Sequence, residues 1–226
     1  MNIPLSRILW KSSFRIIASR YPTIHPFEKI SSPEDWEALF EIEAMTNDRL
    51  RHAKQEIKYF EESKIPEQEN RTYILAPFIH LNPLGSRFSD GSWGVYYAAK
   101  FIQTAIAETK YHRENFMRAT LEKAMNIEMR VITATIKGLF HDIRNPGSTA
   151  KTVLDNESYQ ASQRLAKHLK AKNSDALLYP SVRDLEHREC AAVFNPQRIS
   201  HCQIDKHLLY HWDGKCISQV LEIKEI

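Results

Sequence analysis

One segment of this chain, a glycine-punctuated loop that leads through a short strand into a helix, constrains the fold more than any other. Residues 85–113 read GSRFSDGSWGVYYAAKFIQTAIAETKYHR. Glycines interrupt the first part, where Arg87 lies in the loop, and the β-branched and aromatic run at 95–97 suits a strand. A helix is expected next, and it carries Glu108.

Glu108 falls at the edge of the apolar face of this expected helix. At about 100° per residue, Ile102, Ala105 and Ile106 share a face with Phe101, and Glu108 lies about 20° from Phe101. A carboxylate in such a position is partly desolvated, which is unfavourable unless it is paired or serves chemistry. For the helix taken alone, a solvated flanking glutamate is the simpler interpretation.

The bulk composition fits one domain of ordinary globular type. The chain has 226 residues, of which 42% are hydrophobic and 26% charged, so it is long enough for a sizeable core. The formal net charge of +3 comes without a polybasic arm, so charge alone does not indicate a nucleic-acid partner. A basic cleft for an anionic small molecule fits this balance equally well.

Cysteine usage and the N-terminus indicate a soluble protein of the cytoplasm. The three cysteines are an odd number without a CxxC pair, which argues against a disulfide framework and favours a reducing compartment. Near the N-terminus, Arg7, Lys11 and Arg15 interrupt the apolar residues, so neither a signal peptide nor a membrane span is predicted.

Strands interspersed with helices predict an α+β protein with a single domain, 1–226. Residues 1–70 are expected to form a largely helical extension packed on a catalytic core at 71–226. Asp213-Gly214 is the strongest hairpin signal, and Asn173 is the expected C-cap of a helix. Besides the helix with Glu108, helices are predicted from Ser32, at 47–59 and at 157–172, and strands at 72–79, 95–97, 127–136 (ended by Gly138), 176–179, 190–194, 207–212 and 215–221.

Four motifs in order make the chain resemble the RES-domain family, which is named for an arginine, a glutamate and a serine. GSRF supplies Arg87 and VYYAA supplies Tyr97. TAIAE supplies Glu108 at the family's tyrosine-to-glutamate spacing, and YPSVRD supplies Ser181. The resemblance covers most of the chain, because FRIIASRYP, TNDRLR and HLLYHWDG also look like segments of the longer RES proteins.

Two features depart from the commoner RES pattern. Phe88 and Ser89 follow the arginine, whereas many members have a tryptophan and an asparagine there. Ala98-Ala99 gives the helix no polar cap where many members have one. Both bear on the shape of the pocket, and neither removes a residue that the family's chemistry needs.

The resemblance implies a fold, a reaction and a partner. The fold would be a split β-sheet core with inserted helices, similar to diphtheria-toxin-like ADP-ribosyltransferases. The reaction would be cleavage of the nicotinamide–ribose bond of NAD, with water or inorganic phosphate as acceptor and without a metal. The protein would be the toxin of a bacterial toxin–antitoxin system, restrained in the cytoplasm by an Xre-like antitoxin encoded nearby; a homo-oligomer stays open.

The resemblance also implies a role for each site residue. The catalytic set is Glu108, Arg87 and Tyr97: Glu108 would stabilise an oxocarbenium-like ribose, and Arg87 would anchor the pyrophosphate or the ribose beside it. Tyr97 would pack at the nicotinamide end. The NAD-binding set is Arg87, Phe88, Tyr97 and Ser181, in which Ser181 would orient ribose or phosphate by hydrogen bonding.

Each of these residues also has a simpler interpretation. A loop arginine such as Arg87 is usually just solvated, and Tyr97 is by default a core aromatic. Tyr96 and Tyr97 alternate across a strand, so only one can face a pocket, and the motif favours Tyr97. Ser181 could simply cap a turn; no GxSxG sequence surrounds it, so a serine nucleophile is not predicted.

Two other classes of function remain open at this point. One is a protein mono-ADP-ribosyltransferase with the same fold, and the other is a non-catalytic nucleic-acid-binding module. A metal site is not expected, because none of the ten histidines falls in HExxH. The cluster of His201, Cys202, His207 and His211 lies on predicted strands, whose alternation directs side chains to both faces.

Overall fold

Strand β3 (Met125–Asp142) is the centre of the fold because it pairs with three other strands. It runs antiparallel to β1 (Leu5–Ala18) over almost the full length of both. On its other edge it pairs first with β6 (Ile199–Trp212), antiparallel, and then, at residues 141–142 only, with β4 (Ala176–Pro180), parallel. The sheet therefore divides at β3, which is the physical origin of the split core.

The structure is a computed structural model, and it describes residues 3–19, 70–145 and 150–224. The helices predicted from Ser32 and at 47–59 lie outside the described residues, as does most of the expected N-terminal extension.

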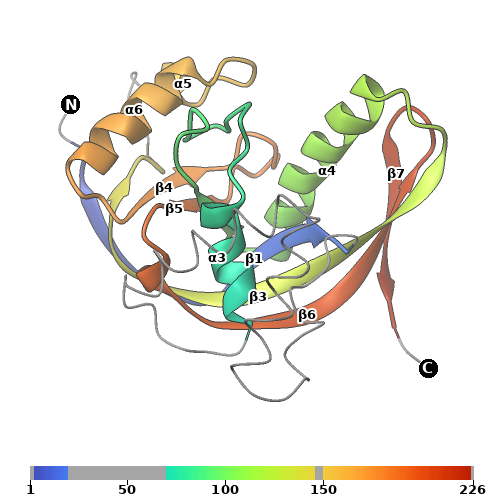
Figure 1. The fold of residues 1–226 in the computed structure, drawn as a ribbon, viewed down its shortest axis with the longest axis horizontal. Helices are drawn as coiled ribbons and strands as arrows, with labels where there is room; N and C mark the ends of the chain where they lie inside the picture. The colour runs from blue at the N-terminus through green and yellow to red at the C-terminus, as the bar shows by residue number, and fades with distance from the viewer. Residues whose placement is uncertain (1–2, 20–69, 146–149, 225–226) are drawn as a thin grey trace, which may run out of the picture.

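The sheet has seven strands in the order β1-β2-β5-β4-β3-β6-β7, and the additional pairing of β1 with β3 closes the first five into a ring (Figure 1). The short strands are β2 (Tyr96–Ala99), β5 (Glu189–Val193) and β7 (Ile217–Ile223). β1 joins β2 through the pair Phe14 and Ala99. β6 and β7 extend beyond the ring, so strand β7 lies at one end of the sheet.

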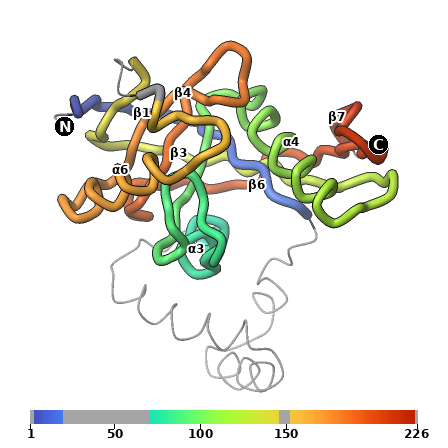
Figure 2. The backbone as a smooth tube through the Cα atoms, turned by 90° about the horizontal axis from the view of Figure 1, so that it is seen from above, coloured from blue at the N-terminus to red at the C-terminus, as the bar shows by residue number. Residues whose placement is uncertain are grey.

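Three of the described helices surround the loop that leads into β2. α4 and α6 stand on opposite sides of the loop that leads into β2, and α3 lies at the base of that loop (Figures 1 and 2). The helical elements are α3 (Arg71–Ile79), α4 (Ile102–Ala119), α5 (Ala150–Val153), α6 (Gln160–Ala171) and the single 3₁₀ turn η1 (Pro196–Arg198).

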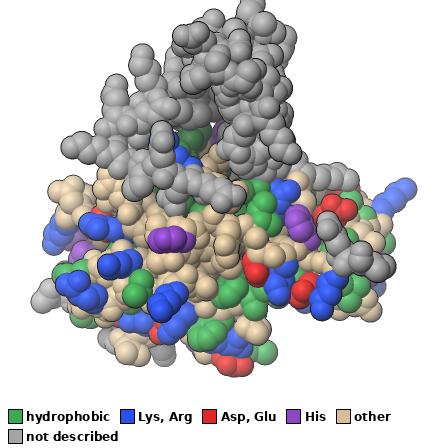
Figure 3. Space-filling model, turned by 90° about the horizontal axis from the view of Figure 1, so that it is seen from below, with side chains coloured by type: hydrophobic (Ala, Val, Ile, Leu, Met, Phe, Trp, Pro, Cys, Tyr) green, Lys and Arg blue, Asp and Glu red, His purple; other side chains and the backbone are tan. Residues whose placement is uncertain are grey.

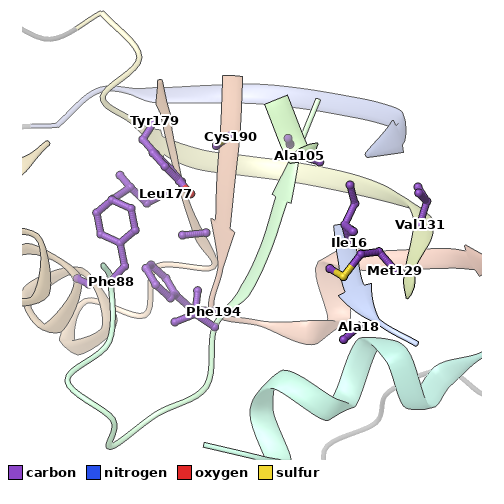
Figure 4. Packing of buried hydrophobic residues seen from close by; sticks show 14 of the residues in the cluster. Ile16, Ala18, Phe88, Ala105, Met129, Val131, Leu177, Tyr179, Cys190 and Phe194 are labelled. Atoms are coloured by element: carbon purple, nitrogen blue, oxygen red, sulfur yellow. The ribbon is translucent and has the colours of Figure 1, made fainter. Parts of the chain in front are cut away.

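Both faces of the short central strands are buried. Neighbouring residues alternate between two apolar clusters: Leu177 belongs to one and Leu178 to the other, as their side chains point to opposite faces. In the first cluster the rings of Phe88 and Tyr179 meet edge to face, with centroids 4.9 Å apart (Figure 4). This core is what holds the loop before β2 against the sheet.

Most sequence predictions for the core are confirmed. The α+β class is correct, and the strands at 95–97, 176–179 and 190–194 correspond to β2, β4 and β5. β6 and β7 flank Asp213-Gly214 as an antiparallel pair. The C-cap of α6 is Lys172, one residue before the predicted Asn173, which follows it with φ 58° in the left-handed conformation that ends helices.

Residues 72–79 form helix α3, and the predicted strand there is wrong. A helix that is buried around most of its circumference has no polar stripe, so its sequence reads as a continuous apolar run. Pro77 lies inside this helix and therefore marks no sheet edge. The buried residues of α3 are Tyr73, Ile74, Leu75, Phe78 and Ile79.

Strand β3 continues past Gly138 to Asp142, so Gly138 does not end the strand as predicted. A Cβ at Gly138 would lie 2.3 Å from the ring of Phe140, which is fully buried. The glycine thus makes room for an aromatic side chain of the core instead of breaking the strand.

Candidate active site

A pocket of about 450 Å³ opens between α4, the loop before β2 and the segment 154–159 that precedes α6. Its walls include Arg87, Tyr97 and Glu108, which the sequence motifs single out. Phe88 and Ser181 are both fully buried and lie behind the wall. The structure therefore brings three of the five predicted site residues to the pocket surface.

Glu108 reaches the pocket from the second turn of α4, where a hydrogen bond from another element fixes its carboxylate. The Ser181 hydroxyl donates to Glu108 Oε1 at 2.6 Å. The same hydroxyl oxygen accepts the backbone N–H groups of Arg183 at 3.1 Å and Asp184 at 2.9 Å. One donor and two acceptor positions are all that a serine hydroxyl has, so Ser181 has no capacity left for a ligand.

The role of Ser181 in binding ribose or phosphate stays a prediction. In the structure its hydroxyl holds the carboxylate of Glu108. Its loop is tied to α4 a second time, because Thr104 donates a 2.6 Å hydrogen bond to the buried carboxylate of Asp184. The serine motif and the glutamate motif, 73 residues apart in sequence, thus form one rigid corner of the pocket.

The environment of Glu108 acts on its pKa in opposite directions. Burial raises the pKa of the carboxyl above its ordinary value, and the nearby Asp184 acts in the same direction. The hydrogen bond from Ser181 and the positive charges of Arg87 and Arg183 oppose that rise. A half-buried carboxylate that shares a pocket with one guanidinium group, Arg87, and lies near a second, Arg183, is a common arrangement at functional sites.

Tyr97 presents its ring to the pocket, while Tyr96 points to the opposite face of β2 and is fully buried. The Tyr97 hydroxyl accepts the backbone N–H of Phe88 at 2.9 Å and shares a 2.8 Å hydrogen bond with the Ser86 hydroxyl. Burial raises the pKa of Tyr97 to about 12, so the phenol stays protonated at physiological pH. Its hydroxyl anchors the loop, and its ring is the part available to a ligand.

The loop that carries Arg87 is a tight turn held from both ends. Ser86 and Ser89 bond each other through their backbones, and Gln163 of α6 donates to the carbonyls of both, at 3.0 and 3.1 Å. Phe88 inserts its ring into the core, and Arg87 extends into the pocket. The prediction that Phe88 binds the ligand stays a prediction; in the structure its side chain packs in the core and anchors the loop.

Arg87 is itself held in place by the segment before α6. Its Nη1 donates to the backbone carbonyl of Asp155 at 2.7 Å, and its guanidinium lies 4.6 Å from the ring centroid of Tyr159. Only 8% of the residue is exposed. A guanidinium in this position retains donors and charge for an anionic ligand.

Several pocket residues were not predicted from the sequence. Tyr111 and His112 follow Glu108 on α4 by three and four residues, a spacing that places side chains on one helix face and would have identified them. Partial burial, with Arg183 and Arg87 nearby, lowers the pKa of His112, so its ring is neutral at pH 7. Arg15 of β1 also lines the pocket; it lies in the segment FRIIASRYP that resembles RES proteins, but it was not predicted as a site residue.

Two further properties concern the whole described part of the chain. Among residues 3–19, 70–145 and 150–224, no group of three or more His, Cys, Asp or Glu side chains could hold a metal ion. Within the same ranges, no helix is long and apolar enough to cross a membrane.

Comparison with known proteins identifies the family. The protein y4oC of Sinorhizobium fredii (strain NBRC 101917 / NGR234), described as uncharacterized, is 31% identical over 205 residues, which cover 91% of this chain and 84% of that protein. Among solved structures, a chain of the M. tuberculosis MbcT–MbcA toxin–antitoxin complex aligns with a TM-score of 0.42 and 14% identity, covering 58% of this chain and 74% of that one. The family model of the RES domain matches residues 65–213, so this chain belongs to the RES-domain family.

Proposed function

We propose that this protein is an NAD-consuming enzyme that cleaves the bond between nicotinamide and ribose. The observation that carries the proposal is the carboxylate of Glu108, held by Ser181 at the wall of a pocket that also contains Arg87. The volume of about 450 Å³ lies within the range of roughly 300–1,000 Å³ typical of small-molecule sites.

The proposed reaction needs stabilisation of charge at the moment of bond cleavage. When the C–N bond breaks, nicotinamide leaves with the bonding electron pair as a neutral molecule, and positive charge develops on the ribose ring. The Glu108 carboxylate would stabilise that charge, because its position is fixed before the substrate arrives. Arg87 would hold the phosphates, and the ring of Tyr97 would pack against the nicotinamide end.

The acceptor must lose a proton when it bonds to the ribose carbon. His112 is a suitable base because its ring is neutral at pH 7, and neither of its ring nitrogens has a hydrogen-bond partner among the described residues. It lies one helical turn after Glu108, on the same wall of the pocket. Water and inorganic phosphate both supply such a proton, so the products must identify the acceptor.

We also propose that the enzyme is the toxin of a toxin–antitoxin pair, as the resemblance of its motifs to RES toxins implies. An enzyme that depletes NAD in its own cell must be restrained by a partner. A nucleic-acid-binding function has less support: on the face in Figure 3, Lys and Arg side chains are interspersed with acidic ones and form no continuous basic stripe.

Chromatography of the products from purified protein and NAD, with and without phosphate, tests the reaction. Free nicotinamide with ADP-ribose would identify water as acceptor, and ADP-ribose 1″-phosphate would identify phosphate. Labelled protein after incubation with labelled NAD would favour the protein-modifying alternative instead. A folded protein that releases no nicotinamide contradicts the proposal.

Expression in a bacterial host tests the toxin role separately. Expression of this chain alone should arrest growth and deplete NAD, and co-expression with the neighbouring open reading frame should relieve both. Normal growth and an unchanged NAD level, with the folded protein present in quantity, would contradict this role.

A further inference from the structure

We propose that Arg87 and Arg183 together form a clamp for a diphosphate, and that the two backbone carbonyls of segment 154–159 that the arginines bond in the structure compete with that diphosphate. The proposal rests on the proposed function, which it deepens by assigning the dinucleotide's diphosphate to a second residue, Arg183. It also assigns segment 154–159 as a strap that the ligand must displace.

The two arginines come from distant parts of the chain and bind consecutive carbonyls. Arg87 Nη1, from the loop before β2, donates to the carbonyl of Asp155 at 2.7 Å. Arg183 Nη2, from the loop after β4, donates to the carbonyl of Asn156 through a short hydrogen bond. Successive Cα atoms are about 3.8 Å apart, so the two guanidinium groups reach points one peptide unit apart. The two phosphates of a diphosphate, linked through one bridging oxygen, present their outer oxygens over a comparable distance.

Both guanidinium groups lie over aromatic rings, and no salt bridge within the described residues neutralises their positive charges. Arg87 lies over Tyr159 and Arg183 over Tyr111, with distances to the ring centroids of 4.6 and 3.4 Å. In the described part of the chain, neither arginine forms a salt bridge, and the side chain of each makes a single hydrogen bond. A guanidinium has five N–H donors.

A phosphate is a better partner for these arginines than a carbonyl. Its negative charge forms charge-assisted, often bidentate bonds, which are roughly twice as strong as neutral ones. The carbonyls of Asp155 and Asn156 therefore act as stand-ins for phosphate oxygens. Both arginines also lie close enough to Glu108 for their charges to lower its pKa, so a diphosphate held between them would lie beside the reacting ribose.

Segment 154–159 has its own local structure and does not depend on the arginines for it. The Asp155 carboxylate accepts the N–H groups of Glu157 at 2.8 Å and Ser158 at 2.7 Å, which closes a turn within the segment. Residues 155–158 are exposed on their outer side. The turn can therefore move away as a unit when phosphate oxygens replace the two carbonyls.

Calorimetry with ADP tests the clamp without any cleavage step, because ADP has the diphosphate but no nicotinamide. Arg183→Ala should weaken ADP binding roughly 10- to 100-fold, as expected for the loss of a hydrogen-bonded charge, and should weaken AMP binding less. Arg183→Lys should recover part of the loss, since lysine keeps the charge without the planar fork. Arg164→Ala, which removes an exposed arginine of α6, is the matched control and should bind as wild type.

The outcomes separate the clamp from the proposed reaction. A folded Arg183→Ala protein that binds ADP as tightly as wild type, or more tightly, overturns the clamp, as does a wild-type protein that binds no ADP. If Arg183→Ala retains wild-type ADP affinity while wild type releases nicotinamide from NAD, the reaction stands and the clamp fails. If ADP affinity depends on Arg183 but NAD is not cleaved, the clamp stands and the reaction fails.

Limited proteolysis tests the strap. Saturating ADP should speed cleavage after Glu157 by a glutamate-specific protease in the wild-type protein, because the segment gives up its carbonyl bonds to the two arginines. Unchanged or slower cleavage there, with ADP demonstrably bound, would contradict displacement of the carbonyls.

Discussion

Glu108 and Arg87 face the same pocket, but the polar groups around them are satisfied in different ways. At the Glu108 corner, every hydrogen-bonding position of the Ser181 hydroxyl is used, and the residue is fully buried. By contrast, the side chains of Arg87 and Arg183 each make one hydrogen bond within the described part of the chain, to a carbonyl of an exposed segment. The Ser181 hydroxyl is closed to ligands, whereas the two arginines have partners that a ligand can replace.

We infer from this difference that Glu108 serves turnover and that the two arginines serve ligand affinity. A carboxylate that must meet developing charge gains from a fixed position, because no reorganisation is then needed during the reaction. A phosphate site can instead bond a partner that the ligand replaces. Here the partners are the carbonyls of Asp155 and Asn156, each of which accepts a hydrogen bond from one arginine. Variants on the Glu108 side should therefore change turnover, and variants on the arginine side should change affinity.

The largest effect is expected for Glu108→Gln, which removes the charge but keeps the shape. Turnover of NAD should fall by roughly 10²–10³, the usual cost of losing one preorganised electrostatic group. ADP affinity measured by calorimetry should stay close to that of wild type. Glu128→Gln, on an exposed position of β3, is the control and should leave turnover unchanged. Near wild-type turnover in folded Glu108→Gln would remove Glu108 from the chemistry.

Arg87→Ala should weaken NAD binding roughly 10- to 100-fold, because a charge-assisted bond to phosphate is lost. Arg87→Lys should restore only part of that affinity. The measurement is calorimetry with NAD in a Glu108→Gln background, in which turnover does not interfere. Unchanged affinity in Arg87→Ala would mean that the arginine is not a ligand, and the two sides of the pocket would no longer differ as described.

Ser181→Ala should lower turnover by roughly 10- to 100-fold without abolishing it, since a hydrogen bond to a charged group is worth about 1.5–3 kcal/mol. Without this donor the pKa of Glu108 should rise further, so the acidic limb of the pH–rate profile should move to higher pH. A purely structural role would leave that limb in place. A covalent serine adduct detected by mass spectrometry would contradict the positioning role and make Ser181 a nucleophile.

The smallest expected effect concerns stability. Burial raises the pKa of Glu108 above the ordinary value of 4.5, so between that pH and the raised pKa the folded protein holds a proton that the unfolded chain has lost. Stability therefore falls as pH rises through this window, and the neutral Glu108→Gln variant should melt at a slightly higher temperature than wild type at pH 7. The difference should fade as pH falls toward 4.5, and equal melting temperatures at both pH values would contradict this account.

Local motifs predicted three residues of the pocket wall, Arg87, Tyr97 and Glu108, and tertiary packing decided the remainder. Strand β2, helix α4 and the hairpin at Asp213-Gly214 follow from patterns within ten or twenty residues. Helix α3 escaped prediction because a helix that is buried around most of its circumference shows no clear amphipathic period. The burial and contacts of Phe88 and Ser181 escaped for a related reason: no feature of the nearby sequence reveals which distant residue will bond the Ser181 hydroxyl or cover the Phe88 ring.

The hydrogen-bond partner of Arg183 could not be predicted from the sequence, although Arg183 lies beside the serine motif. It follows Ser181 by two residues, yet its partner carbonyl belongs to Asn156, 27 residues earlier. The alternation of Tyr96 and Tyr97, by contrast, was fully predictable, because strand geometry sends adjacent side chains to opposite faces.

Proton NMR of NAD mixed with the wild-type protein tests the central claim most directly, because it follows the nicotinamide ring from bound dinucleotide to free product in one sample. The account predicts free nicotinamide in step with the loss of NAD, and almost none from Glu108→Gln under the same NAD-saturated conditions. Intact NAD after prolonged incubation with folded wild-type protein, or equal release by the Glu108→Gln variant, would contradict it.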